Sequence, residues 1–258
     1  MTRVVVILAH ASDVGSRFVA DWLASKLGAQ AVRIVRPETL SLAQWSQTVD
    51  GRGRAITRVA WPREEPLEDS GVGAVFNRIR YLPTPRFHRA SAKDRDYAGA
   101  ELQAVVTSWL AGFDERVVHV VRRHPWLTPM LPLQHWASAA AACQLPVAAR
   151  TIISSARALR RPVGSASTNG RGTPAPPIPG GSVLVAGREA AGSLSSRYGS
   201  RCLALARALG FPLLEFRFAS DRDAAVLVDV DPLPPLLEPW AVALTGHLLE
   251  SLAAGVSA

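Results

Sequence analysis

The sequence predicts an α/β protein, and three observations carry the prediction. Within the first 36 residues an apolar run, an amphipathic helical pattern and a second apolar run follow one another. That order is the βαβ unit, whose two strands lie parallel. Further strand and helix patterns alternate to the end of the chain, interrupted by one stretch rich in Pro, Gly and Ser. With 258 residues, 48% of them hydrophobic, the chain can form one large domain or two small ones.

The first βαβ unit has clear local signals. Val4 to Ala9 is a continuous apolar run, which predicts a buried strand. Asp13 is placed to cap the helix that follows, and Gly28 is placed to end it. Ala31 to Val35 then predicts the second, parallel strand.

A hairpin and a buried strand come next. Leu42 to Val49 and Ala55 to Ala60 predict two strands, and the Asp50-Gly51 pair between them favours a tight turn. Val72 to Phe76 predicts a strand that ends directly before Asn77 and Arg78.

The rest of the chain is divided by one stretch of different composition. Arg161 to Ser182 contains five prolines among Gly, Ser and Thr, and this composition predicts a linker or mobile loop. Pro83 to Asp96 is polar and basic without a period, and it predicts a shorter loop. The other predicted elements are helices over Tyr97 to Phe113, Pro132 to Leu145, Ser200 to Leu209 and Pro239 to Ala253, and strands over Val117 to Val121, Ala148 to Ile153, Val183 to Val185, Leu213 to Phe218 and Ala225 to Val230.

The basic charge comes almost entirely from arginine. The chain has 27 arginines but only two lysines, Lys26 and Lys93, and its formal net charge is +8. Because the arginines are scattered rather than gathered in one patch, the charge indicates a solvated surface and not a nucleic-acid partner.

The sequence also predicts a cytoplasmic protein without a membrane segment. No apolar run approaches the roughly 20 residues that span a bilayer. The apolar start is interrupted by His10 and Asp13 before it could form a signal peptide. Cys143 and Cys202 lie inside apolar helical patterns, so neither a disulfide nor a cysteine metal site is expected.

Four stretches together resemble a known family. They are Val4 to Val35 with the following hairpin; Val75-Phe76-Asn77-Arg78 with Tyr81-Leu82-Pro83; Arg123-His124-Pro125-Trp126 with the segment to Pro146; and Cys202 to Gly210 followed by Glu215 and by Leu227-Val228-Asp229-Val230-Asp231-Pro232. In this order they resemble the ATP-grasp ligases, in particular the peptide-maturing branch that crosslinks microviridin-type peptides.

This resemblance implies a Rossmann-like N-terminal domain over residues 1–115 and a truncated ATP-grasp-like α+β domain over residues 116–258. In that family a smaller subdomain holds the ATP phosphates with lysines. Here the region between Ile153 and Val183 is too short for such a subdomain and contains no lysine. The chain is therefore expected to be a reduced form without the lysine-bearing lid.

The resemblance also implies a metal site. Glu215, Asp229 and Asp231 match the carboxylates that hold magnesium in the family, because a hard cation prefers oxygen ligands. Residues 229 and 231 are two apart on one strand and face the same way. The alternative is that these are ordinary solvent-facing acids near a hairpin over Ser220 to Asp223.

Four residues are predicted to bind substrate: Asn77, Arg78, Arg123 and His124. Ligands of open α/β sheets bind beyond the carboxyl ends of the strands, where Asn77 and Arg78 are expected. Arg78 could hold the carboxylate of a ligand in a bidentate fork. The alternative is that Arg78 pairs with one of the C-terminal acids and ties the two domains together.

Two functions follow from the resemblance. The first is a degenerate, non-catalytic accessory or binding protein of a peptide-modifying pathway, whose partner is a peptide, a small-molecule substrate or a partner enzyme. The second is an active carboxylate-amine or ester-forming ligase that uses ATP and Mg²⁺; only this second function requires these cofactors. A core without its covering subdomain would expose apolar surface, so a homodimer is also expected.

Overall fold

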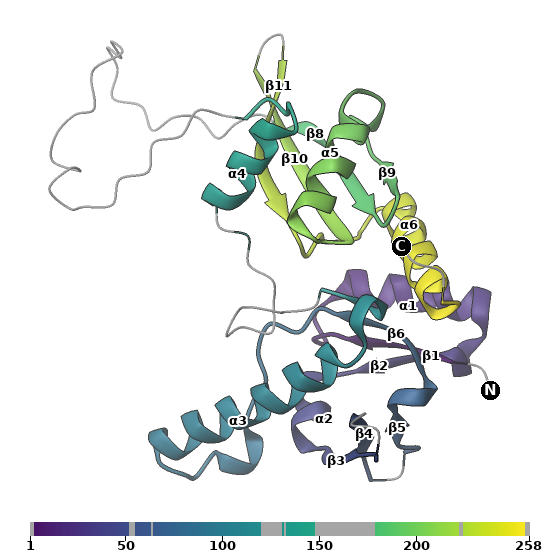
Figure 1. Cartoon of the computed structure of the whole chain (residues 1–258), viewed down its shortest axis with the longest axis vertical. Coiled ribbons are helices and arrows are strands. Elements are labelled where there is room, and N and C mark those ends of the chain that lie inside the picture. Colours follow the sequence, from purple (N-terminus) through teal and green to yellow (C-terminus); the bar gives the residue numbers. More distant parts are fainter. Residues whose placement is uncertain are drawn as a thin grey trace, which may run out of the picture.

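The computed structural model describes residues 3–51, 55–62, 64–119, 131, 133–147, 179–221 and 224–255. Within these residues the strands form a four-stranded parallel sheet, a four-stranded antiparallel sheet and a small three-stranded antiparallel sheet (Figure 1). Helices pack on both four-stranded sheets. The predicted α/β fold class is therefore confirmed.

The parallel sheet contains the predicted βαβ unit. Its strand order is β2 (Val32–Val35), β1 (Val4–Leu8), β6 (Val72–Asn77) and β7 (Val117–Val118), and each neighbouring pair is parallel. Helix α1 (Val14–Leu27) connects β1 to β2. As predicted, Asp13 caps α1 and Gly28, with φ of 92°, ends it.

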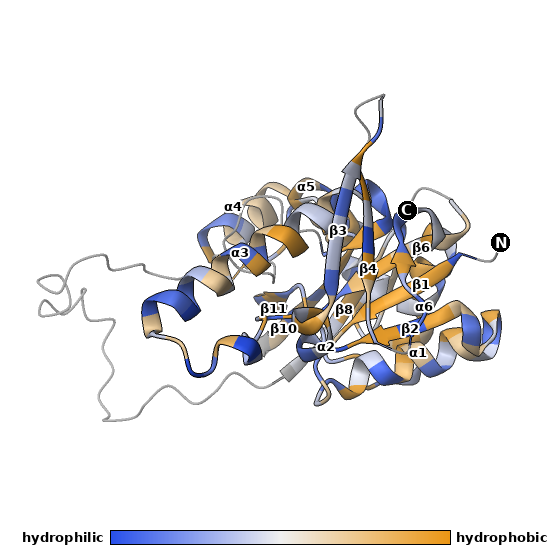
Figure 2. Ribbon diagram, turned by 90° about the horizontal axis from the view of Figure 1, so that it is seen from below, coloured by the Kyte–Doolittle hydropathy of each residue, from blue (hydrophilic) through white to orange (hydrophobic). Residues whose placement is uncertain are grey.

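Both faces of the parallel sheet are covered. Val5 and Ile7 of β1 pack on α1 and on α6 (Pro239–Ala253), whereas Val6 and Leu8 pack on the opposite side. That opposite side is covered by α2 (Pro37–Leu42), α3 (Ala92–Ala111) and the small sheet. Burial on both faces explains why these strands read as continuous apolar runs, and Figure 2 shows β1 and β6 in the hydrophobic colour.

The small sheet contains the predicted hairpin. Its strands are β3 (Gln44–Val49), β4 (Ala55–Ala60) and β5 (Leu67–Glu68), all antiparallel. Leu42, predicted to begin the first strand, instead ends α2. This short helix starts at Pro37, whose ring suits the first helical position, and it buries Leu40 in the core.

The antiparallel sheet forms the other layer. Its order is β11 (Ala224–Asp231), β10 (Leu213–Asp221), β8 (Pro179–Ala186) and β9 (Glu189–Ala191). Helices α4 (Leu133–Ala142) and α5 (Ser195–Leu209) pack on one face of it, against Phe216 and Phe218. Cys202 is buried in this cluster and both cysteines are free, as predicted.

Helix α6 joins the two layers. It contacts α1 and β6 on one side and β8 and β9 on the other (Figure 1). Its bounds, Pro239–Ala253, are those that the sequence predicts. Strand β7, which follows residue 115, still belongs to the parallel sheet. The predicted division into residues 1–115 and 116–258 stays a prediction.

Other predicted boundaries are also wrong, and helix α4 ends at Ala142 rather than at Leu145. Helix α3 begins at Ala92, because the Ser91 hydroxyl accepts the Asp94 N–H at 3.2 Å and caps the helix within the predicted loop. Helix α5 begins at Ser195 instead of Ser200. The last residues of the predicted linker, from Pro179, belong to β8 and pair with β10.

The rest of the predicted linker and the strand over Ala148 to Ile153 lie outside the described residues. Among the described helices, none has both the length and the apolar character that a membrane crossing requires. Single 3₁₀ turns complete the described structure at Ala29–Ala31, Asp69–Gly71, Pro85–Phe87 and Asp114–Arg116.

Candidate functional site

A cavity of about 630 Å³ opens at the carboxyl edge of the parallel sheet. It is lined by the segment after β1, by the segment after β6, and by residues of β10, β11 and the chain that follows β11. The chain leaves β1 toward β2 on one side, and β6 lies on the other side of β1. The cavity therefore sits where the strand order reverses, which is the usual ligand site of open α/β sheets.

Arg78 and Asp13 line this cavity as an ion pair. Arg78 Nε donates to Asp13 Oδ2 at 2.6 Å, and the guanidinium lies 5.4 Å from the Phe76 ring. The Arg78 side chain is only 6% exposed and that of Asp13 17%. Burial alone would raise the pKa of Asp13, but the hydrogen bond and positive charge of Arg78, with the Ser16 N–H, lower it.

Arg78 is therefore paired with Asp13, a residue of its own layer. Its fork closes on the residue that caps α1, and the predicted alternative of a pair with the C-terminal acids does not occur in the structure. This arrangement ties β6 to the start of α1. Asn77, the neighbouring predicted residue, is 1% exposed and does not line the cavity. Its Nδ2 donates to the His119 carbonyl at 3.3 Å, and its Oδ1 accepts the Ile79 N–H at 3.2 Å.

The two other predicted substrate-binding residues, Arg123 and His124, lie outside the described residues. Of the predicted set, the cavity brings together Arg78 and Asp231. Sequence reasoning missed His10, Arg80 and Tyr81 as lining residues. The signal that could have found them is position, because they follow the carboxyl ends of β1 and β6.

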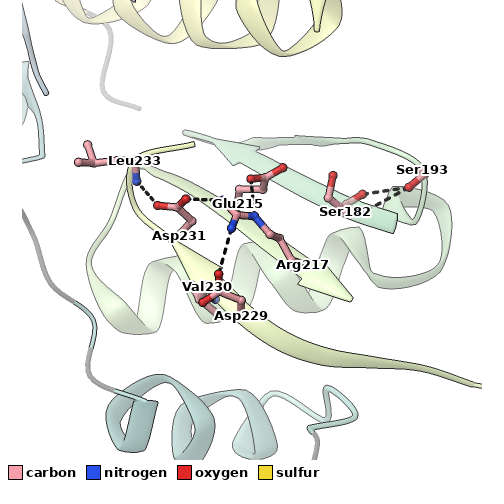
Figure 3. Close-up of polar contacts among 8 residues, drawn as sticks. All are labelled: Ser182, Ser193, Glu215, Arg217, Asp229, Val230, Asp231 and Leu233. Atoms are coloured by element: carbon pink, nitrogen blue, oxygen red, sulfur yellow. Dashed lines mark hydrogen bonds and ion pairs between the residues drawn. The ribbon is translucent and has the colours of Figure 1, made fainter. Parts of the chain in front are cut away.

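The three acids of the predicted metal site lie close together, and all three contact Arg217. The antiparallel register sets Glu215 opposite Asp231 and Arg217 opposite Asp229. Because residues two apart share a face, all four side chains gather on one side of the sheet, as Figure 3 shows. The guanidinium uses each of its three nitrogens for a different carboxylate.

The distances define a closed ion-pair group. Arg217 Nε donates to Glu215 Oε2 at 3.0 Å, Nη1 donates to Asp229 Oδ2 at 3.1 Å, and Nη2 donates to Asp231 Oδ2. The other oxygens of the two aspartates accept backbone N–H groups, from Val230 at 3.0 Å and from Leu233 at 2.8 Å. Partial burial would lower the pKa of Arg217, but the hydrogen bond to Glu215 and the surrounding negative charges raise it.

The predicted magnesium ligands Glu215, Asp229 and Asp231 are all paired with Arg217 in the structure. A magnesium ion among these acids stays a prediction, and it would require the Arg217 guanidinium to move. In the described part of the chain, no set of three or more His, Cys, Asp or Glu side chains is arranged to hold a metal. The two-residue spacing from Glu215 could have revealed Arg217, since it places both side chains on one face.

His119 lies near Arg78 and Phe76. Its ring is 5.9 Å from that of Phe76, its backbone has φ of 75°, and the residue is 1% exposed. Neither ring nitrogen has a hydrogen-bond partner among the described residues. Burial and the charge of Arg78 lower the pKa of His119 to about 3.

We expect this histidine to make stability depend on pH. The pKa of His119 is about 3 in the folded chain and 6.5 in the unfolded chain, so its contribution is complete above pH 6.5. It is lost as pH falls, by up to about 1.4 kcal/mol per unit. Urea unfolding should therefore show a loss of about 2 kcal/mol between pH 7 and pH 5.

The matched variant is His119→Asn, since asparagine tolerates a positive φ. It should lose less stability over the same pH range. Asp13 does not interfere, because its pKa lies below 3.8. An equal pH slope in both proteins would contradict the assignment to His119.

No family model matches the sequence, and no curated protein matches it. Solved structures do match the fold. One is the macrocyclase MdnB from Microcystis aeruginosa MRC, with a TM-score of 0.62 and 13% identity, covering 96% of this chain and 99% of that chain. A second is a RiPP-associated ATP-grasp ligase from Chryseobacterium gregarium in complex with ADP and a leader and core peptide, with a TM-score of 0.71 and 11% identity, covering 98% and 97%.

A third is the ATP-grasp ligase PsnB complexed with a minimal precursor, Mg and ADP. Its TM-score is 0.64 at 12% identity, and the match covers 97% of each chain. The match to all three solved structures thus extends over nearly the whole chain. This chain has the fold of the RiPP-associated, peptide-modifying ATP-grasp ligases.

Proposed function

We propose that this chain is a non-catalytic, ATP-grasp-derived accessory or binding protein of a peptide-modifying biosynthetic pathway. The observation that carries the proposal is the Arg217 guanidinium among Glu215, Asp229 and Asp231. These are the acids that the resemblance assigns to Mg²⁺. A protein that keeps the fold but fills this position with its own cation is suited to binding and not to metal-dependent phosphoryl chemistry.

The argument is one of competition for the same oxygens. Mg²⁺ requires near-octahedral oxygen ligands at about 2.0–2.1 Å, and arginine stays protonated at any physiological pH. The ion would have to displace a guanidinium that is already held by three carboxylates. Because Arg217 belongs to the same strand as Glu215, its positive charge is present beside these acids whatever the metal concentration.

The lysine distribution supports the same proposal. Both lysines lie in the first 93 residues, and none follows. Charge-assisted hydrogen bonds are worth about 1.5–3 kcal/mol each, so the loss of lysines that hold phosphates would weaken ATP binding by orders of magnitude. The predicted absence of the lid subdomain, a homodimer and a cytoplasmic location all stay predictions.

The peptide part of the proposal is supported by the fold neighbours. The Chryseobacterium gregarium ligase is in complex with a leader and core peptide, and PsnB is in complex with a minimal precursor. A peptide is therefore the first partner to test for this chain. Both complexes also contain ADP, and that of PsnB contains Mg, which favours an active ATP-dependent ligase as the second candidate.

Calorimetry with Mg²⁺ and ATP separates the two candidates. We expect no saturable binding of Mg²⁺-ATP to the wild-type chain at 100 µM. The variant Arg217→Met should gain affinity for Mg²⁺ by tenfold or more, because it releases three carboxylates while keeping an unbranched side chain. Arg188→Met is the matched control, since Arg188 is an exposed arginine in the turn between β8 and β9 of the same sheet and has no carboxylate partner among the described residues.

The active-ligase candidate makes the opposite prediction. Wild-type binding of Mg²⁺-ATP tighter than about 100 µM, or about −5.5 kcal/mol, would overturn the accessory function. So would an Arg217→Met variant that binds Mg²⁺ no better than the wild type while Arg188→Met behaves identically.

A further inference from the structure

We propose that the cavity at the edge of the parallel sheet binds a monoanionic carboxylate with an apolar or aromatic body, and that Arg80 is the cation that receives it. The inference goes beyond the proposed function, because it concerns the β1 and β6 edge and holds whether or not the chain binds ATP. The carboxylate could belong to a small organic acid or to the C-terminus of a peptide.

The first argument is the pairing of the charges in the cavity. Among the described residues, three arginines and two aspartates line it. Arg78 is paired with Asp13, and Arg217 is paired with Asp231. Arg80 is the remaining cation, and its exposed guanidinium has no carboxylate partner among the described residues.

Arg80 is anchored through its backbone. Its N–H donates to His10 Nε2 at 3.3 Å, which links the segment after β6 to the segment after β1. This hydrogen bond holds the segment after β1 and the segment after β6 together at the backbone of Arg80. A fixed backbone with an unpaired planar guanidinium suits bidentate recognition of a carboxylate.

The second argument is the apolar rim. The Tyr81 ring packs against His10 in a tilted arrangement with ring centroids 4.7 Å apart, yet Tyr81 remains 59% exposed. Val14 is 45% exposed and Leu237 58% exposed, and both also line the cavity. Exposed large apolar side chains that gather around one unpaired cation match an amphipathic ligand with a charged end and an apolar body.

Backbone geometry at the rim supports a ligand site. Leu236 has φ of 51°, a left-handed conformation that is unusual for a residue with a branched side chain. Its side chain is buried in the core, and this conformation places the chain so that Pro235 and Leu237 line the cavity. Strained backbone of this kind is retained mainly at ligand sites.

The charge count favours a monoanion over phosphate. Arg80 is the one arginine without a carboxylate partner among the described lining residues, and Asp13 and Asp231 would repel a second negative charge on the ligand. Glu215 and Asp229, which lie on Arg217 outside the cavity, add to this repulsion. A cavity of about 630 Å³ also lies within the range of about 300–1,000 Å³ of small-ligand pockets.

The test is an NMR titration of the ¹⁵N-labelled full chain with 3-phenylpropionate. We expect saturable shifts at cavity residues with a Kd on the order of 1 mM. The neutral amide, 3-phenylpropionamide, should bind at least tenfold more weakly. A dipeptide with an acetylated N-terminus and a C-terminal phenylalanine carboxylate separates the two sources: tighter binding than the small acid assigns the site to a peptide terminus, and weaker binding assigns it to a free acid.

Arg80→Gln should weaken 3-phenylpropionate at least tenfold, and Tyr81→Ala should weaken it without lowering thermal stability. Arg89→Gln is the matched control, because it removes the same charge from an exposed arginine that does not line the cavity, and it should change Kd less than twofold. Equal effects of Arg80→Gln and Arg89→Gln, or no shifts at cavity residues, would overturn the proposal. Tighter binding of inorganic phosphate at the same residues would overturn the preference for a carboxylate.

Discussion

Replacing Arg78 with alanine is expected to lower the free energy of unfolding by about 3–5 kcal/mol, because it leaves the Asp13 carboxylate buried without its counterion. The two side chains are 6% and 17% exposed, so water screens this pair little. In a chain of this size the loss corresponds to a fall in Tm on the order of 10 °C. Thermal unfolding followed by circular dichroism measures it directly.

Two controls separate a structural arginine from a ligand-binding one. Arg80→Ala removes an exposed arginine two residues away and should leave Tm unchanged. Asp13→Asn in the Arg78→Ala background should recover part of the loss, because asparagine can still accept the Ser16 N–H without a charge. An unchanged Tm for Arg78→Ala would return this residue to the set of ligand-binding candidates.

Gly15→Ala is the second substitution with a large expected effect. A Cβ at this position would lie 2.0 Å from the Pro235 carbonyl oxygen and 3.1 Å from Leu236 Cβ. Helix α1 and the chain after β11 would have to separate, and overpacking of this kind costs about 1–3 kcal/mol. The same movement would widen the cavity, so ligand shifts at its residues should weaken together with Tm.

Gly199→Ala provides the matched control within a helix. A Cβ there meets Ala190 Cβ at 3.5 Å, an ordinary contact, and alanine is the better helix former by about 1 kcal/mol. The two glycine-to-alanine changes should therefore shift urea midpoints in opposite directions. A stabilised Gly15→Ala would mean that α1 does not pack against Pro235 in solution.

Local signals were sufficient where an element carries an apolar run or a buried face that repeats at helical spacing, whereas the Ser91 cap of α3 was missed within a polar segment. Helix α6 begins at Pro239 and ends at Ala253 as predicted, since proline marks its first turn and its buried face repeats at helical spacing. The strands β1 and β6 were predictable because burial on both faces makes their sequences largely apolar. Short α2 was not, because six residues give too little periodicity and its stability comes from Leu40 in the core.

The sequence also determined some features of the candidate site, and the tertiary structure decided the others. The sequence by itself determined which acids would lie together, because a period of two fixes the shared face of Asp229 and Asp231. It also determined that Arg78 would stand at the end of a strand. Only the tertiary structure decided the partners: Asp13 reaches Arg78 across 65 positions, and the β10 and β11 register brings Arg217 to three carboxylates. Partners depend on register and on the packing of distant segments, and no local pattern contains either.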